Sequence, residues 1–357
     1  MKPMNKNILT CIILSVYING VAQDIHWSQP WNALIYQNPA FAGIDSRYSI
    51  GVNYRDQWNA VNKSYKTFMV AGDYRFQKGL PENVAIGLGE IISSDNSADG
   101  SYKTNSGGLV LSCLVKANPF VNIGAGIGYS IVQNSLADNF TWGAQFDGNS
   151  YNSSLATGEN NNKFFHQYGD LNAGVSYIYN RNVGTVNGND NMKWIIGYSV
   201  NHLTQPNIAI TGNKDKIAVK HLATITGLLP IKDNFSWRPV ILFGRQGKMN
   251  EITFGTLARY TLGEVSQITG IKKGMQFSIG ALYRVNDAFI PTAEFQKANY
   301  ILALSYDVNA SKFTSATKFR GGFEIALRIV APGTYLYIDK EAPPRNKKSK
   351  KEGTPMF

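Results

Sequence analysis

The chain has 357 residues, of which 43% are hydrophobic, and it carries a formal net charge of +11. Its mean hydropathy of -0.20 is too polar for a bundle of membrane helices, and after residue 22 no apolar run approaches the ~20 residues that a spanning helix needs. The 34 glycines, 19 tyrosines and 18 phenylalanines are instead typical of β-strands with aromatic girdles.

Residues 1–22 have the pattern of a secretion signal. Lys2 and Lys6 give a positive start, residues 8–18 form a short apolar stretch, and the Gly-Val-Ala of residues 20–22 offers a small-residue cleavage site. We therefore expect an exported protein whose mature chain begins at Gln23.

Residues 23–46 precede the first expected strand and show no regular period. Their Trp and Pro content predicts an ordered plug or latch, packed in or under a lumen, rather than a floppy leader. The residues at the centre of this expectation are His26, Trp27, Gln29, Asn38, Pro39 and Ala40.

Residues 47–330 alternate between apolar and polar side chains. Near the end of this region Phe323, Ile325 and Leu327 share one face, while Glu324 and Arg328 point the other way. The alternation recurs through the chain, and beside a secretion signal it favours lipid on the apolar side and a lumen on the polar side. Pattern counting gives roughly 14 antiparallel strands, so the sequence predicts an all-β, transmembrane outer-membrane β-barrel.

An even number of strands returns both ends of the barrel to one side, and we expect both termini in the periplasm. With that orientation the shorter turns face the periplasm, and the longest outer loop runs through residues 133–167. Its aromatic residues, set among Asn, Ser and Gly, suit protein contact, and they suit equally well a loop folded into its own mouth. The candidate partner-binding residues are Phe140, Trp142, Phe146, Tyr151 and Glu159.

Residues 331–357 follow the last expected strand and form a basic tail on the periplasmic side. Anionic peptidoglycan, lipid head groups or an acidic partner would be attracted to it, although a solvated, disordered tail explains the same composition. Nucleic acid is disfavoured as a partner because an exported barrel would not meet it. The basic residues are Arg345, Lys347, Lys348, Lys350 and Lys351.

No pattern indicates catalysis, a cofactor or a metal site. The 4 histidines show no His-x-x-x-His spacing. His202 and His221 flank one predicted outer loop, where the two would be able to meet, but a role in an aromatic girdle or at the rim is favoured for them. Gly124, Gly126 and Gly128 lie inside a strand with no helix after it, which favours lumen-facing glycines over a phosphate loop. We therefore expect a protein that is not an enzyme.

Several sequence blocks together resemble the PorP/SprF membrane proteins of the type IX secretion system. That family opens with Asp-x-His-Phe-Ser-Gln, followed by Asn-Pro-Ala and a Gly. Here residues 24–29 are Asp-Ile-His-Trp-Ser-Gln, with Trp27 where Phe is usual, and residues 38–40 are Asn-Pro-Ala. Further blocks of resemblance are residues 54–58, 153–159, 305–309 and 320–324.

The resemblance implies a non-enzymatic, outer-membrane component of the secretion or gliding machinery. Such a protein helps a secreted cargo protein or adhesin to reach the cell surface or to stay attached to it. The implied partners are that cargo or adhesin, periplasmic subunits of the secretion system, and outer-membrane lipid. The resemblance does not say which cargo is involved.

Residues 38–40 also resemble the N-terminal plug of FadL-type transporters, which makes uptake of a hydrophobic solute the alternative function. The lumen distinguishes the two functions, because a path for an apolar ligand needs mostly apolar walls. The charged residues that we expect to face the lumen are Arg47, Arg55, Asp73, Arg75, Asp170, Glu294, Asp307, Glu324 and Arg328.

Overall fold

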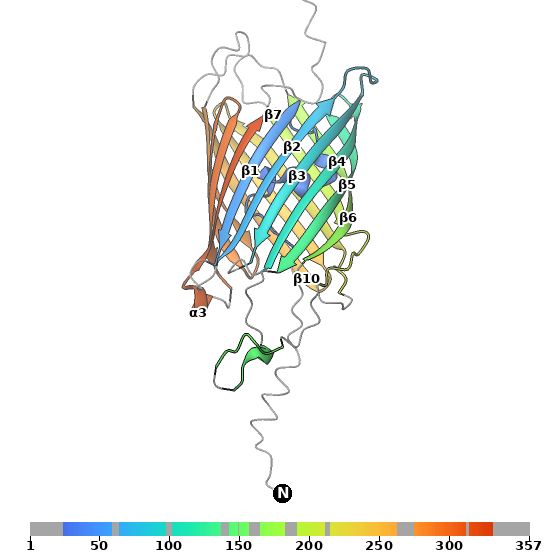
Figure 1. Ribbon diagram of the computed structural model, residues 1–357. Coiled ribbons are helices and arrows are strands. Elements are labelled where there is room, and N and C mark those ends of the chain that lie inside the picture. Colours follow the sequence, from blue (N-terminus) through green and yellow to red (C-terminus); the bar gives the residue numbers. More distant parts are fainter. Residues whose placement is uncertain are drawn as a thin grey trace, which may run out of the picture.

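A closed antiparallel β-barrel dominates the computed structural model of the protein (Figure 1). The structure describes residues 24–58, 64–97, 102–136, 143–148, 150–156, 165–182, 191–210, 215–262, 275–311 and 314–330. Within these residues there are 14 strands, as the alternation of side chains predicts. Strand β1 pairs with β14 to close the barrel, with Ser49 opposite Val330 and Gln57 opposite Gly322.

The strands follow the chain in simple up-and-down order. They are β1 (Tyr48–Gln57), β2 (Tyr65–Phe76), β3 (Val84–Asn96), β4 (Tyr102–Asn118), β5 (Val121–Leu136), β6 (Phe165–Asn182), β7 (Asn191–Asn201), β8 (Lys220–Lys232), β9 (Phe235–Gln246), β10 (Met249–Leu262), β11 (Met275–Arg284), β12 (Ala288–Lys297), β13 (Tyr300–Asn309) and β14 (Arg320–Val330). Closure gives every strand two neighbours, so that the backbone N–H and C=O groups pair within the wall, as hydrocarbon demands.

Side chains alternate between the two sides of the wall. In β14, Phe323 and Leu327 are exposed on the outside, whereas Glu324 and Ala326 are buried inside. Apolar residues therefore cover the outer surface, and polar residues line the lumen, which is the arrangement of an outer-membrane barrel. In the part of the chain that the structure describes, no helix is long and apolar enough to cross a membrane.

The barrel has two unlike ends. We call the end at which β1, β3, β5, β7, β9, β11 and β13 finish the long-loop rim. The two longest intervals between strands in the sequence, from β5 to β6 and from β7 to β8, begin and end at this rim, which also carries the short helix α3 (Thr314–Thr317) and is the lower end in Figure 1. The other end, the short-turn rim, holds the start of β1 and the end of β14.

Residues 24–46, which we call the lumen segment, run through the inside of the barrel. The segment contains the short helices η2 (Pro30–Asn32), α2 (Leu34–Gln37) and η3 (Pro39–Phe41), drawn in blue behind the strands in Figure 1. Asp24 contacts Lys220 at the long-loop rim, and Asp45 contacts Arg328 near the short-turn rim.

The course of the lumen segment differs from the expectation that both ends of the chain share one side. Asp24 and Val330 lie at opposite rims of the barrel. Fourteen strands do return the start of β1 and the end of β14 to one rim, but the lumen segment crosses the barrel once more before β1 begins. The predicted signal at residues 1–22 and the basic tail at 331–357 lie outside the described residues.

Candidate functional site in the barrel lumen

Burial of the lumen segment is nearly complete. Trp27, Trp31, Phe41 and Ile44 are each at most 4% exposed, because the inner faces of the strands surround them. Prolines open both of its 3-10 helices, where their missing N–H is not needed. Asn38 caps the second one by accepting a hydrogen bond from the backbone N–H of Ala40 at 2.9 Å.

On one side of the lumen, charged side chains bind this segment through hydrogen bonds within a network of ion pairs. The Ser28 hydroxyl donates to Asp307 at 2.6 Å and accepts from Arg55 at 2.8 Å and from Arg284 at 3.1 Å. Both guanidinium groups also pair with Asp307, at 2.8 Å and 3.0 Å. The Glu324 carboxylate accepts the backbone N–H of Ser28 at 2.7 Å and pairs with Arg55 at 3.3 Å.

This network joins parts of the chain that are far apart in sequence. Gln29 donates its backbone N–H to Glu324 at 3.1 Å and its side-chain amide to Ser305 at 3.0 Å, and Arg55 also donates to the backbone oxygen of His26 at 2.7 Å. Desolvating these charges is costly, and the hydrogen bonds among them offset that cost only while all partners are present. We call the inner faces of β1 and β11 to β14 the charged wall.

Trp31 extends the contact to β12. Its indole N–H donates to Glu294 at 2.7 Å, and the same carboxylate pairs with Arg238 at 2.7 Å. The Arg238 guanidinium lies 4.9 Å from the centroid of the Trp31 ring, which adds a cation–π contact. A buried tryptophan thus satisfies its one donor on the wall of the barrel.

The opposite side of the lumen holds the segment with small residues. Two rows of Gly and Ser cross the wall, one over β3 to β7 and one over β5 to β7, each residue directly opposite the next on the neighbouring strand. We call them the small-residue wall. The first row is Gly87, Ser112, Gly126, Gly174 and Ser199, and the second is Gly124, Ser176 and Gly197.

Residues 37–42 of the segment lie directly on this wall. A Cβ added at Gly126 would come within 2.5 Å of the backbone of Pro39 and Ala40, so only glycine permits this approach. The hydroxyls of Ser199, Ser112 and Ser176 donate to the backbone oxygens of residues 37, 42 and 40 at 2.6, 2.7 and 3.2 Å. The segment backbone is thereby hydrogen-bonded to the barrel without any charge.

Asn38 inserts its side chain between two strands of the same wall. Its amide donates to the backbone oxygen of Val175 on β6 at 3.0 Å and to that of Tyr198 on β7 at 3.3 Å. The Asn-Pro-Ala block of the sequence therefore lies at the centre of the stretch that contacts the small-residue wall.

At the long-loop rim the start of the segment is held by a charged cluster, which we call the rim latch. His202 lies between two carboxylates, with Asp24 at 2.7 Å and Asp170 at 2.9 Å, and Lys220 pairs with Asp24 at 3.3 Å. Burial alone would lower the pKa of His202, but the hydrogen bonds to both carboxylates raise it to about 9. Burial opposes ionisation of Asp24, and the charges of Lys220 and His202 overcome it, holding the pKa of Asp24 well below its usual range.

At the short-turn rim Asp45 ends the segment in a second ion cluster. It pairs with Lys193 at 2.9 Å and with Arg328 at 2.9 Å. The charge of Lys193 is the main reason that the pKa of Asp45 lies well below its usual range. Next to it, the backbone N–H of Gly43 donates to Asp73 at 2.8 Å.

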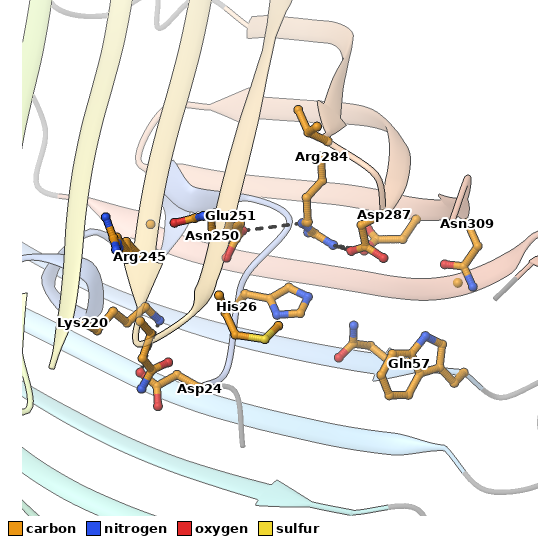
Figure 2. Close-up of a pocket in the computed structure, with 17 residues that line it drawn as sticks. Asp24, His26, Gln57, Lys220, Arg245, Asn250, Glu251, Arg284, Asp287 and Asn309 are labelled. Carbon is orange, nitrogen blue, oxygen red and sulfur yellow. Dashed lines mark hydrogen bonds and ion pairs between the residues drawn. The ribbon is translucent and has the colours of Figure 1, made fainter. Parts of the chain in front are cut away.

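Two cavities flank the start of the lumen segment, and Asp24 and Lys220 line both. The first, of about 250 Å³, is shown in Figure 2, where Arg284 reaches toward Glu251 and Asp287 while His26 and Gln57 face the same space. The second, of about 220 Å³, lies between the segment and β3 to β6. Among the described residues no group of three or more His, Cys, Asp or Glu side chains is arranged to hold a metal ion.

The residues proposed for a plug all lie in the lumen segment, and the structure brings them onto the walls. Trp27 is buried and packs edge-on against Tyr36, with ring centroids 6.5 Å apart, and the imidazole Nε2 of His26 is buried without a hydrogen-bond partner among the described residues. Gln29 is on the charged wall; Asn38, Pro39 and Ala40 are on the small-residue wall.

In the loop expected to bind a partner, Phe146 and Tyr151 form an isolated β-bridge with ring centroids 5.8 Å apart. Both side chains are exposed, by 54% and 42%. Phe140, Trp142 and Glu159 lie outside the described residues. So do the basic tail residues Arg345, Lys347, Lys348, Lys350 and Lys351.

The expectation for one lumen residue was wrong, and the two histidines that flank an outer loop do not meet. Arg47 does not face the lumen: it precedes β1, is exposed and donates to the hydroxyl of Tyr74 at 3.2 Å. His202 and His221 bond to different partners, because His202 is in the rim latch while His221 shares a hydrogen bond of 2.7 Å with Tyr198 on the outer surface. The alternation places residues only within strands, and Arg47 lies just before one.

Sequence reasoning missed several lumen residues. Arg284 is the clearest case, since it lies on the same face of β11 as Gln276 and Ser278 and so was accessible from the alternation. Lys193 is a second case, because it shares the inward face of β7 with Gly197 and Ser199. Asp24 and Asp45 lie outside the strands, where the alternation gives no signal.

Taken together, the alternating wall, the strand closure and the polar interior define an outer-membrane β-barrel whose lumen is occupied by its own N-terminal segment. The chain belongs to the PorP/SprF family, described as type IX secretion system membrane proteins, whose match covers residues 19–329. This is a family of secretion-system membrane barrels and not a known enzyme class. The search of curated proteins found no match.

Solved structures that are similar to the chain share little of its sequence. A FadL homologue from Pseudomonas aeruginosa is 12% identical, with 87% of this chain and 96% of that chain covered and a TM-score of 0.46. The CymD monoaromatic hydrocarbon channel is 12% identical, with 87% and 93% covered and a TM-score of 0.43. The KdgM porin is 9% identical, with 79% and 99% covered and a TM-score of 0.35.

Proposed function

We propose that this protein holds a secreted type IX cargo protein or adhesin at the cell surface, at the long-loop rim, and is not itself a conduit. The observation that carries this proposal is the occupied lumen, in which residues 24–46 are fixed to both walls. A chain in transit would have to displace Trp31 and Phe41 together with the buried ion network. Surface attachment requires no such displacement.

The orientation of the barrel supports contact at the long-loop rim. Short turns face the periplasm in barrels of this kind and longer loops face outward, and the two longest stretches of sequence between strands, residues 137–164 and 202–219, join strand ends at the long-loop rim. The exposed pair Phe146 and Tyr151 in the first of these loops offers rigid aromatic area to a protein partner. Residues 331–357 would then follow β14 into the periplasm, where their basic side chains would attract an anionic partner.

Replacement of Phe146 and Tyr151 by serine tests the attachment role. In cells that lack the native protein, the Phe146→Ser, Tyr151→Ser double variant should lose surface-attached protein, measured by mass spectrometry of peptides shaved from intact cells. Phe319→Ser is the matched control, since Phe319 is at least as exposed as the two loop residues and lies near the same rim but outside this loop. Unchanged surface protein in the double variant would contradict the proposal.

The lumen segment also acts as a plug in this proposal. The intact protein should show little steady conductance in a planar bilayer, and deletion of residues 24–46 should raise it. A large steady conductance of the intact protein would show that the segment does not close the pore.

Uptake of a hydrophobic solute is the alternative function. The second cavity favours this alternative, because Ile25, Ile35 and Ile91 form part of its lining. The first cavity opposes it, since Arg284, Glu251 and Asp287 give that space charged walls. Native mass spectrometry of the protein extracted from outer membranes separates the two functions. A bound apolar small molecule would support the alternative, and a co-purified secreted protein would support attachment.

A further inference from the structure

The outer surface of the barrel carries a charge far from either end of its strand. Glu90 is the seventh of the 13 residues of β3, which lies between β2 and β4 on the near side of the barrel in Figure 1. Its side chain is exposed on the same face as Leu88 and Ile92, so it points away from the lumen. The other exposed Asp, Glu, Lys and Arg side chains of the described strands each belong to the first or second residue from a strand end; they are Lys66, Lys103, Arg181, Lys232, Arg245, Lys297 and Arg320.

The neighbours of Glu90 place it near the middle of the membrane. Gly72 lies directly opposite it on β2, and the exposed rings of Phe68 and Phe76 lie on either side of Gly72 on the same outer face. Each ring is four residues from Gly72, which is about 13 Å along a strand and about 10 Å of depth in a tilted one. The two rings therefore lie near the edges of an apolar band about 25 Å tall, with Glu90 about halfway between them.

The Glu90 carboxylate is unpaired within the chain. Neither a hydrogen bond nor an ion pair joins it to another residue in the described parts of the structure. Its direct neighbours across the strands are Gly72 on β2 and, on β4, Leu109, which is 62% exposed. A charged side chain on the lipid face is most costly at the membrane midplane. Ionisable residues within a membrane are rare and mark functional positions at which another group serves as the partner.

Two glycines beside Glu90 supply a second, independent observation. Gly72 adjoins Glu90 on β2, and Gly107 faces outward on β4 opposite Ile92, the next outward residue of β3. Apart from its chain neighbours, a Cβ added at Gly107 would meet no atom of the protein within 4 Å. Small residues at an interface within a membrane permit close approach of a second backbone. The surface around Glu90 thus offers both an unpaired charge and room for a partner.

We propose that the outer face of β2 to β4 around Glu90 binds a second membrane protein, which places a lysine or arginine side chain against the Glu90 carboxylate. The depth excludes a soluble protein, and it excludes lipid head groups, which lie at the two membrane interfaces. A second copy of this chain does not supply the basic group, because the exposed Lys and Arg side chains of its described strands lie at the strand ends. This site is separate from the long-loop rim and does not depend on what the rim holds.

Photocrosslinking of the full-length protein in intact cells tests the proposal. p-Benzoylphenylalanine replaces Leu109, beside Glu90, or Ile279, which is 57% exposed on β11, far around the barrel from β3. We expect a discrete adduct with a second outer-membrane protein from position 109 and none from position 279. Mass spectrometry of the crosslinked peptides should place a lipid-facing lysine or arginine of the partner beside this position.

Variants of Glu90 test the ion pair itself. With the crosslinker at position 109, Glu90→Gln should lower the adduct yield about tenfold, because a hydrogen bond between charged groups is lost. Glu90→Asp keeps the carboxylate and should retain most of the adduct. Glu90→Lys should abolish it, and replacement of the partner's basic residue by glutamate should then restore it. The heat-dependent gel shift of barrels shows that each variant is folded.

The stability of the isolated protein is a second readout that needs no partner. In vesicles of phosphatidylcholine the carboxylate has only lipid around it, so Glu90→Leu should raise the urea midpoint of unfolding. Ile92→Leu is the matched control on the same strand and face, and its midpoint should equal that of the wild type.

Four results would overturn the proposal. The first is the absence of an adduct from position 109, or equal adducts from positions 109 and 279. The second is a wild-type yield in folded Glu90→Gln. The third is an adduct made only of two copies of this chain, which would assign the face to self-association. The fourth is an unchanged or lower urea midpoint in Glu90→Leu, which would show that lipid does not surround the carboxylate.

Discussion

The two walls that hold the lumen segment do so by different physics. On the charged wall, Ser28 and Gln29 are bound by ion-paired side chains such as Arg55 and Glu324. On the small-residue wall, residues 37–42 are bound through close backbone approach and hydroxyl donors such as Ser199. One wall depends on charge, the other on shape.

This difference assigns different tasks to the two halves of the segment. A buried network of several charges fails abruptly when one partner is lost, because the others are left desolvated. The contacts of a surface of Gly and Ser are not coupled in this way, and each contributes its own small free energy independently of the others. We therefore expect single changes on the charged wall to release the segment, and single changes on the small-residue wall to loosen it.

Glu324→Ala is the change with the largest expected effect. It leaves the Arg55 guanidinium with one carboxylate fewer and leaves the backbone N–H groups of Ser28 and Gln29 without an acceptor. Removal of one partner from a buried pair costs about 3–5 kcal/mol. Hydrogen–deuterium exchange should show residues 24–46 losing protection while the strands keep theirs.

Glu251→Ala is the control for that measurement. Glu251 lies 3.6 Å from Arg284 and is partly exposed, so its loss should change protection by less than about 1 kcal/mol. Equal protection in Glu324→Ala and the wild type would show that the charged wall does not hold the segment.

Gly126→Ala has the next largest expected effect, and it tests the small-residue wall. The added Cβ would lie 2.5 Å from the backbone of Pro39 and Ala40, and such overpacking costs about 1–3 kcal/mol. The control is Gly128→Ala on the same strand and face, where the nearest atom would be 3.5 Å away, an ordinary contact. If residues 24–46 show the same exchange protection in both variants, close packing against this wall does not hold the segment.

The sequence predicted the barrel better than it predicted the lumen. Strand number and faces follow from the alternation of neighbours, as in β14, where Phe323 and Glu324 point to opposite sides. Contacts such as that of Ser28 with Glu324, 296 residues apart, have no local signal. For the same reason the sequence predicted a plug at residues 23–46 only from their Trp and Pro content, and it could not predict which wall residues contact them.

The small-residue wall could be predicted from the sequence only in part. The glycines at 124 and 126 could be assigned to the lumen face from their position in β5 alone. That Gly126 aligns with Ser112, Gly174 and Ser199 depends on the register of four strands, and a shift of one residue would turn each to lipid. Register is set by the whole barrel, so the wall becomes visible only in the fold.

The rim latch adds a pH dependence to the charged side. The pKa of His202 is raised to about 9 in the folded protein, so the stability it contributes is fully present below about pH 6.5 and is lost as the pH rises through about 9. Since one pKa unit corresponds to about 1.4 kcal/mol, the expected loss between pH 7 and pH 10 is roughly 2–3 kcal/mol. Limited proteolysis near Asp24, mapped by mass spectrometry, should increase between pH 7 and pH 10.

His202→Gln separates this effect from general alkaline loosening. The variant keeps a side-chain amide that donates to Asp170 or Asp24 but cannot take a proton. Cleavage near residue 24 should then be nearly the same at pH 7 and pH 10. A wild-type-like pH response in this variant would place the titrating group elsewhere.

The smallest expected effect belongs to Ser199→Ala, and it tests whether the small-residue wall is a set of independent contacts. The change removes the hydroxyl that donates to the backbone oxygen of Gln37 at 2.6 Å, with a cost of about 1 kcal/mol. Ser112→Ala removes the equivalent bond to Ala42, more than four residues away along the segment. If the contacts are independent, exchange protection in the double variant should fall by the sum of the two single losses. A double loss much larger than that sum would mean that the wall acts as one cooperative unit, like the charged wall opposite.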